Sequence, residues 1–307
     1  DCLLSRGLGD VYKRQIPAYE KFDAKNRHLL DHWAVWNGFR LSQTTADAFS
    51  IRKRTHADRP WIGTFSGTRA PGYVFAGDVS GGLGVALKDF WQSYPTALQV
   101  DNAAARNARL TVWMWSPDAE PMDLRHYDNV AHDLEASYED VQEGMSTPYG
   151  VARTHTLTLV PSVAYGGKET VARTAVMLAE DAPLLCTPEY LHAKHAFGVW
   201  SLPDRSNLKR ARVEDRLKDY LDYYVKAVDQ HRWYGFWNYG DFMHTYDSVR
   251  HTWRYDVGGY AWDNTELASN MWLWYSFLRT GRADLWRMAV ACLLYTSPSP
   301  RDKRQSR

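Results

Sequence analysis

Residues 110–115 read Leu-Thr-Val-Trp-Met-Trp, an alternating run that is typical of a β-strand with one buried face. Similar short runs occupy residues 39–42, 49–52, 73–77, 83–87 and 154–160. Turn residues separate these runs, as in Ala70-Pro71-Gly72 and in Ser116-Pro117-Asp118. Several strands at this spacing predict a sandwich of antiparallel sheets, which we assign to residues 16–180.

The hydrophobic period changes after Pro183. Residues 213–231 carry one apolar stripe opposite a charged face, which predicts an amphipathic helix. The stripe consists of Leu217, Tyr220, Leu221, Tyr224, Val225 and Val228. A second helix is predicted to begin near Asp263 and to stop at Gly281, a typical C′ glycine. We therefore expect residues 181–291 to form the opening helices of an α/α domain.

The two ends of the chain resemble each other and do not blend into their neighbours. Each reads Cys-Leu-Leu and then, eleven residues after the cysteine, Lys-Arg-Gln. We interpret residues 1–15 and 292–307 as adapter-like tails and set them aside from the reasoning on fold and function. Between them remain 37 − 7 = 30 basic and 36 − 3 = 33 acidic residues, a net charge of −3.

This composition excludes several classes of function. The residues between the tails have no basic surplus and no long Lys/Arg run, so no nucleic-acid partner is expected. Cys186 is the one cysteine outside the tails, which argues against an intrachain disulfide and a zinc cluster. No apolar run is long enough for a membrane span. The localisation stays open: the protein is secreted or periplasmic if its full-length form carries a signal peptide.

The segment between the two predicted helices is rich in aromatic residues. The chain has 14 Trp, and half of them fall between residues 233 and 286. Acids, imidazoles, phenols and glycines are interleaved with these rings over residues 233–262. Sugars offer apolar ring faces to aromatic side chains and hydroxyls to carboxylates and amides. The segment therefore predicts a saccharide-binding cleft.

Two chemistries could use such a cleft. β-Elimination at a uronate needs donors around the carboxylate and a base for the C5 proton. Tyr246 or Tyr239 would serve as base or acid, and His244, Asn238 and Arg254 would hold the carboxylate. Hydrolysis needs two carboxyl groups, one protonated and one ionised, for which Asp241 and Glu266 are the candidates. Further candidates for substrate binding in the same segment are Trp237, Tyr255, Asp256, Trp262 and Asn264.

Structural roles compete with these functional ones. Asp263 and Glu266 have the spacing of a helix-capping pair. Trp272 and Trp274 lie inside the second predicted helix, where a place in the core is the simpler interpretation. The glycines of residues 81–84 are better explained by strand turns than by a phosphate loop, because no Gly-Lys-Ser/Thr follows them.

Several long motifs point to a known family. The runs at 77–84, 87–97, 110–117 and 122–128 resemble the central β-sandwich of the exo-rhamnogalacturonan lyase or YetA-like family. The run from Asn238-Tyr-Gly-Asp241 to Asn264-Thr-Glu266 is similar to the start of the α/α toroid of that family. The resemblance implies a further N-terminal domain, a longer toroid, and eliminative cleavage of rhamnogalacturonan from a chain end.

The leading interpretation is a polysaccharide lyase that acts on an acidic, uronate-containing polysaccharide or oligosaccharide. An inverting glycoside hydrolase and a non-catalytic carbohydrate-binding protein are the alternatives. No cofactor or metal ligand set is indicated, although a Ca²⁺ ion bridging enzyme and uronate is compatible with the chemistry. We expect the chain by itself to be inactive, since the resemblance assigns part of the toroid to residues outside it.

Overall fold

A computed structural model of the chain describes residues 36–120 apart from 79 and 106, then 154–179, 184–236, 242–243, 246–253 and 268–295. The chain divides into two compact units. The first, the sandwich unit, comprises Asp1–Glu120 and His155–Glu180. The second, the helical unit, comprises Pro121–Thr154 and Asp181–Arg307.

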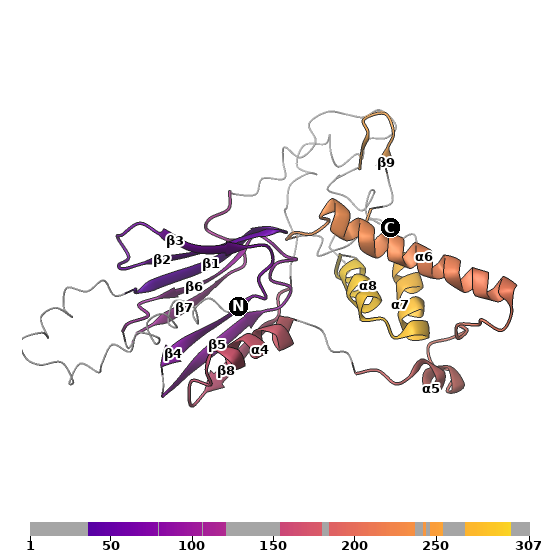
Figure 1. The fold of residues 1–307 in the computed structure, drawn as a ribbon, viewed down its shortest axis with the longest axis horizontal. Coiled ribbons are helices and arrows are strands. Elements are labelled where there is room, and N and C mark those ends of the chain that lie inside the picture. Colours follow the sequence, from indigo (N-terminus) through magenta and orange to yellow (C-terminus); the bar gives the residue numbers. More distant parts are fainter. Residues whose placement is uncertain are drawn as a thin grey trace, which may run out of the picture. The chain divides into compact units, whose positions relative to one another are not determined.

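A five-stranded antiparallel sheet forms one layer of the sandwich unit, in the order β3-β2-β1-β6-β7 (Figure 1). Its strands are β1 (Gly38–Thr45), β2 (Ala48–Arg54), β3 (Ile62–Gly67), β6 (Thr96–Asp101) and β7 (Arg109–Trp113). The sequence predicts β1, β2 and β7, whereas β3 and β6 were not anticipated.

The second layer is a three-stranded antiparallel sheet in the order β4-β5-β8. Its strands are β4 (Tyr73–Asp78), β5 (Gly81–Leu87) and β8 (Leu157–Ser162). Both sheets contribute to one buried cluster, in which Leu41 and Leu98 of the first sheet join Val85 and Leu87 of the second. A fully buried aliphatic side chain of this kind stabilises a fold by about 1.5–3 kcal/mol. The predicted antiparallel β-sandwich is therefore confirmed.

The other face of the three-stranded sheet is covered by a helix that the sequence reasoning missed. Helix α4 (Lys168–Ala179) buries Val171 and Ala175 against Tyr73 and Phe75 of β4. Phe90, which follows β5, is 1% exposed and belongs to the core between the sheets.

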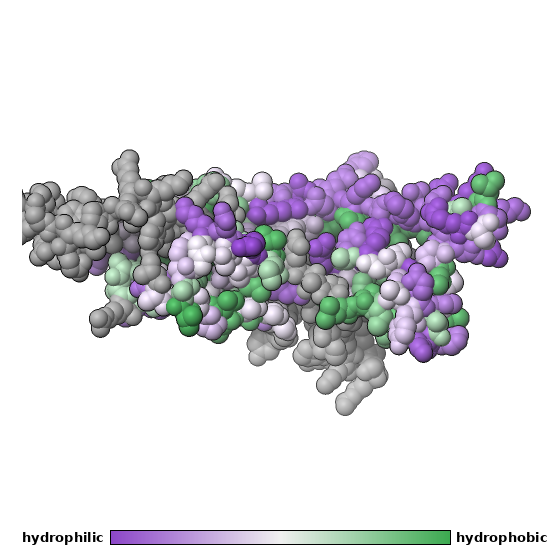
Figure 2. Space-filling view, turned by 60° about the horizontal axis from the view of Figure 1, so that its bottom comes forward, coloured by the Kyte–Doolittle hydropathy of each residue, from purple (hydrophilic) through white to green (hydrophobic). Residues whose placement is uncertain are grey.

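The helical unit contains four described helices and one small hairpin. They are α5 (Pro188–Ala193), α6 (Leu208–His231), β9 (Tyr246–Asp247), β10 (Thr252–Trp253), α7 (Ser269–Thr280) and α8 (Ala283–Tyr295). Helices α6, α7 and α8 share a core that includes Leu221, Leu273 and Leu285. Figure 2 shows hydrophilic residues along most of the visible length of α6, as expected for an amphipathic helix.

Helix α6 confirms the predicted amphipathic helix and begins earlier, at Leu208, because Asn207 caps it by accepting from the backbone N–H of Arg210 at 3.0 Å. Tyr220, assigned to the buried stripe, is instead 57% exposed. Helix α7 ends at Gly281, which has a φ of 68° and confirms the predicted C′ glycine. The predicted start at Asp263 lies outside the described residues.

Two ion pairs connect α6 to the α7–α8 hairpin. The Arg279 guanidinium contacts Glu214 at 2.6 Å, and Arg282 contacts Asp222 at 2.8 Å. Helix α8 continues four residues into the stretch that we set aside, and Cys292 is fully buried in the helical core. Within the described ranges, no helix is both long and apolar enough to cross a membrane.

Candidate functional site

The candidate site begins where α6 ends. Arg232 adopts a left-handed conformation with φ 57°, and its backbone N–H closes the last turn of the helix. The chain reverses there, so that Trp233 packs back against the helix and is only 2% exposed. The Trp233 ring stacks on the His231 ring with a centroid distance of 4.8 Å. The aromatic segment had suggested that Trp233 is a platform for sugar. Because its ring is buried, Trp233 is instead part of the helical core.

A short hairpin adds two more rings to this stack. Tyr246 pairs with Trp253 across β9 and β10, and their ring centroids lie 5.4 Å apart. Trp253 also meets Trp233 edge-on at 4.9 Å and His231 at 5.5 Å. The four rings form a continuous aromatic stack, which we call the hairpin stack: His231, Trp233, Tyr246 and Trp253. Such edge-to-face pairs each contribute about 0.5–1.5 kcal/mol beyond their buried area.

Asp247 closes the turn of the hairpin. Its carboxylate accepts the backbone N–H groups of Val249 and Arg250, each at 2.9 Å, and lies 3.4 Å from the Arg250 guanidinium. His251 completes the turn with a φ of 55°. Because Asp247 is 8% exposed and accepts hydrogen bonds from the turn backbone, it has a structural role. Its carboxylate also holds the Arg250 side chain at the turn.

The segment that precedes the hairpin is anchored in the core. Phe242 is fully buried, and its ring lies 4.4 Å from that of Tyr224 on α6. Met243 is 1% exposed. Trp272 and Trp274 pack against the same core, as the structural interpretation of these two residues predicts. The hairpin stack is therefore packed against the core of the helical unit.

Tyr246 is the functional group that the hairpin stack presents to solvent. Its side chain is 49% exposed, whereas the rings behind it are buried or half-buried. A phenol held in this way can donate or accept a proton at the surface of the unit, and the adjacent indole can offer a flat apolar face.

Tyr246 is also the one candidate residue of the sequence analysis that lies within the described residues. The others lie outside them: Trp237, Asn238, Tyr239, Asp241, His244, Arg254, Tyr255, Asp256, Trp262, Asn264 and Glu266. The sequence reasoning did not single out His231 and Trp253. Their signal was present, because His231 ends the predicted helix and Trp253 lies in the aromatic segment. Within the described part of the chain, no group of three His, Cys, Asp or Glu side chains could hold a metal ion.

Comparison with known proteins relates this architecture to a family. Residues 10–176 match the PcRGLX-like protein central beta sandwich domain, and residues 181–298 match the PcRGLX-like protein C-terminal alpha/alpha toroid domain. The chain belongs to the PcRGLX-like family. The resemblance that the sequence motifs carried is thereby confirmed, and the two domains that this chain matches are a β-sandwich followed by an α/α toroid.

This PcRGLX-like chain is similar in sequence to the uncharacterized protein YetA of Bacillus subtilis (strain 168). The two are 38% identical over 297 residues. The match covers 93% of this chain and 34% of YetA, so the chain spans about a third of the length of that relative.

Proposed function

We propose that the protein cleaves a uronate-containing polysaccharide by β-elimination, with Tyr246 as the group that transfers the proton. The observation that carries the proposal is the half-exposed Tyr246 phenol, held by Trp253 at the end of the hairpin stack in a domain of the PcRGLX-like toroid family. A phenolic side chain is one of the few groups that act as both general base and general acid.

In this reaction the Tyr246 phenolate oxygen removes the proton from C5 of the uronate. The electron pair of the C5–H bond forms the C4=C5 double bond, and the C4–O bond to the leaving sugar breaks. The leaving oxygen takes up a proton, which the Tyr246 phenol returns or water supplies. His244, Asn238 and Arg254 are proposed to neutralise the C6 carboxylate, because the C5 proton is not acidic enough beside a free carboxylate.

The test is a turnover assay on the complete protein with rhamnogalacturonan as the substrate. Each eliminative cleavage creates a double bond conjugated to the carboxylate, which absorbs in the ultraviolet and appears together with one new reducing end. Reducing ends without this absorbance would indicate hydrolysis by the pair Asp241 and Glu266. Binding of acidic glycans without any turnover would indicate a carbohydrate-binding protein.

The role of Tyr246 is tested by Tyr246→Phe. Loss of the hydroxyl should lower kcat by about a hundredfold or more, since a positioned acid or base contributes at least that much. The affinity for substrate should change little, because the ring and its contact with Trp253 are retained. Tyr220→Phe on α6 is the matched control, since this tyrosine is 57% exposed and lies outside the hairpin stack. Unchanged kcat in Tyr246→Phe would assign the proton transfer to another residue.

A further inference from the structure

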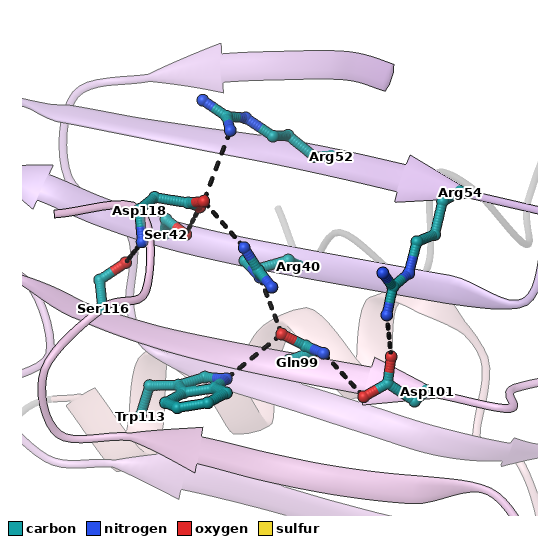
Figure 3. A network of polar contacts seen from close by, with 9 residues as sticks. All are labelled: Arg40, Ser42, Arg52, Arg54, Gln99, Asp101, Trp113, Ser116 and Asp118. Carbon is teal, nitrogen blue, oxygen red and sulfur yellow. Dashed lines mark hydrogen bonds and ion pairs between the residues drawn. The ribbon is translucent and has the colours of Figure 1, made fainter. Parts of the chain in front are cut away.

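The outer face of the five-stranded sheet carries an unusual set of side chains. Every second residue along each strand, such as Leu41 on β1 and Leu98 on β6, points into the sandwich core. The residues between them lie on the opposite side, where a solvated sheet usually carries short polar groups. We call this side the polar face: Arg40, Ser42, Arg52, Arg54, Gln99, Asp101, Arg109 and Trp113, with Asp118 lying across it. Figure 3 shows these side chains apart from Arg109.

One half of the polar face is organised by Asp118. Its carboxylate accepts from Arg40 Nη1 at 2.8 Å and from the Ser42 hydroxyl at 2.5 Å. Arg52 Nη1 lies farther away, at 3.4 Å from the same oxygen that Arg40 contacts. Because Asp118 is already engaged by two closer donors, the Arg52 guanidinium contributes least to this group of contacts.

The other half is organised by Asp101. It accepts from Arg54 at 2.8 Å and from the Gln99 amide at 2.7 Å, and Arg109 lies at 3.4 Å. Gln99 connects the two halves, because its amide oxygen accepts from Arg40 Nε at 2.8 Å. The buried side chains of this network thus form their hydrogen bonds with one another. Arg109 lies farther from Asp101 than these partners do, just as Arg52 lies farther from Asp118.

The charges of this network do not balance. Among the residues that the structure describes, four guanidinium groups face two carboxylates, a local net charge of 4 − 2 = +2. The four groups are those of Arg40, Arg52, Arg54 and Arg109. The buried arginines are 11% and 17% exposed, whereas Arg52 and Arg109 are 42% and 72% exposed. The surplus positive charge is therefore presented to solvent by these two outlying residues.

The surface around Arg52 is open and has a flat aromatic neighbour. Gly63 lies opposite Arg52 on β3, and a Cβ atom there would meet nothing within 4 Å. Ser50 and Ser66, the next pair on the same side, are also small. The half-buried Trp61 ring is covered by Arg40 and Arg54, whose guanidinium carbons lie 4.5 Å and 4.2 Å from its centre. These contacts hold the Arg40 and Arg54 guanidinium groups against the Trp61 ring beside the open strip.

We propose that the polar face is a second binding surface for an acidic polysaccharide, with Arg52 and Arg109 contacting uronate carboxylates. The identity of this ligand rests on the proposed function. Arginine suits it, because the planar guanidinium matches a carboxylate with two parallel hydrogen bonds. The two residues lie on β2 and β7, three strand spacings of about 4.8 Å apart, which is room for an extended chain of several sugar units.

The test measures binding of polygalacturonate by the complete protein, independently of any turnover. In Arg52→Gln/Arg109→Gln the dissociation constant should rise by about fivefold or more, since each exposed charge pair contributes up to about 1 kcal/mol. The matched control is Arg173→Gln/Arg216→Gln, which removes the same charge from two exposed arginines on α4 and α6, outside the polar face. This control should bind as the unmodified protein does.

The affinity should also fall with added salt and be absent for a neutral dextran. Equal binding of the two double variants would overturn the proposal, as would equal affinity for dextran or for double-stranded DNA. The outcome is separable from that of the proposed function. Polygalacturonate binding reports on the polar face even if no cleavage occurs, and cleavage can be measured even if the two arginines prove irrelevant to binding.

Discussion

At the scale of single residues, Asp118 fixes the loop after β7 to the polar face. Its side chain and that of its partner Arg40 are only 10% and 11% exposed. In Asp118→Ala the Arg40 guanidinium loses its carboxylate in a poorly hydrated place, so the free energy of unfolding should fall by about 3 kcal/mol. Urea unfolding measures this, with the exposed Asp58→Ala as control, for which a change within about 0.5 kcal/mol is expected. Similar values for both variants would show that Asp118 is not a buried anchor.

The same scale shows why the roles of individual residues resist prediction from sequence. Tyr246 and Asp247 are neighbours in an aromatic and acidic segment, and a phenol and a carboxylate are both residue types that can take part in catalysis. The hairpin separates them, because alternate residues of a strand point to opposite sides. Tyr246 is left half-exposed, and Asp247 is turned into the loop to bind backbone N–H groups. Which of the two side chains faces solvent depends on where the four-residue turn begins, and no pattern in the sequence fixes that position.

At the scale of elements, the β9–β10 hairpin depends on its aromatic contacts. Each strand has two residues, and a hairpin of this size is not stable alone. Trp253→Ala removes the ring contacts with Trp233, His231 and Tyr246 together, which should speed amide hydrogen exchange over residues 246–253 by about tenfold. Trp200→Ala, next to α5, is the control and should leave this exchange unchanged. Unchanged protection in Trp253→Ala would mean that other contacts hold the hairpin.

Elements with a strong period were predictable, and the others were missed for identifiable reasons. Helix α6 follows from its apolar stripe, and the end of α7 follows from Gly281. Strand β6 was missed because all six of its residues are buried: Leu98 faces the core, while Gln99 and Asp101 are buried by the polar face. Strand β3 is an edge strand with mostly exposed residues, so it has no buried face to reveal it. The polar face joins residues from four separate segments and depends on strand register, which the sequence does not state.

At the scale of the whole molecule, both units rely on carboxylates that are ionised in the folded state. Hydrogen bonds from Arg54, Gln99 and Arg109 outweigh the burial that opposes them, and lower the pKa of Asp101 below its ordinary 3.8. In the helical unit, a hydrogen bond from Lys218 lowers the pKa of Asp222, and one from Arg282 lowers that of Asp284. Each of these groups binds a proton more weakly in the folded chain than in the unfolded one.

A group with a depressed pKa stabilises the fold above its unfolded pKa, and this stabilisation is lost as the pH falls through the folded value. The melting temperature should therefore stay level from pH 7 to about pH 5 and decline below pH 4 in both units. In Asp101→Asn the amide cannot titrate, so the melting temperature at pH 7 should be lower and its decline in acid shallower than in the unmodified protein. Thermal unfolding at pH 7, 4 and 3 measures both quantities. A decline of unchanged steepness in Asp101→Asn would show that the acid sensitivity of the sandwich unit comes from other carboxylates.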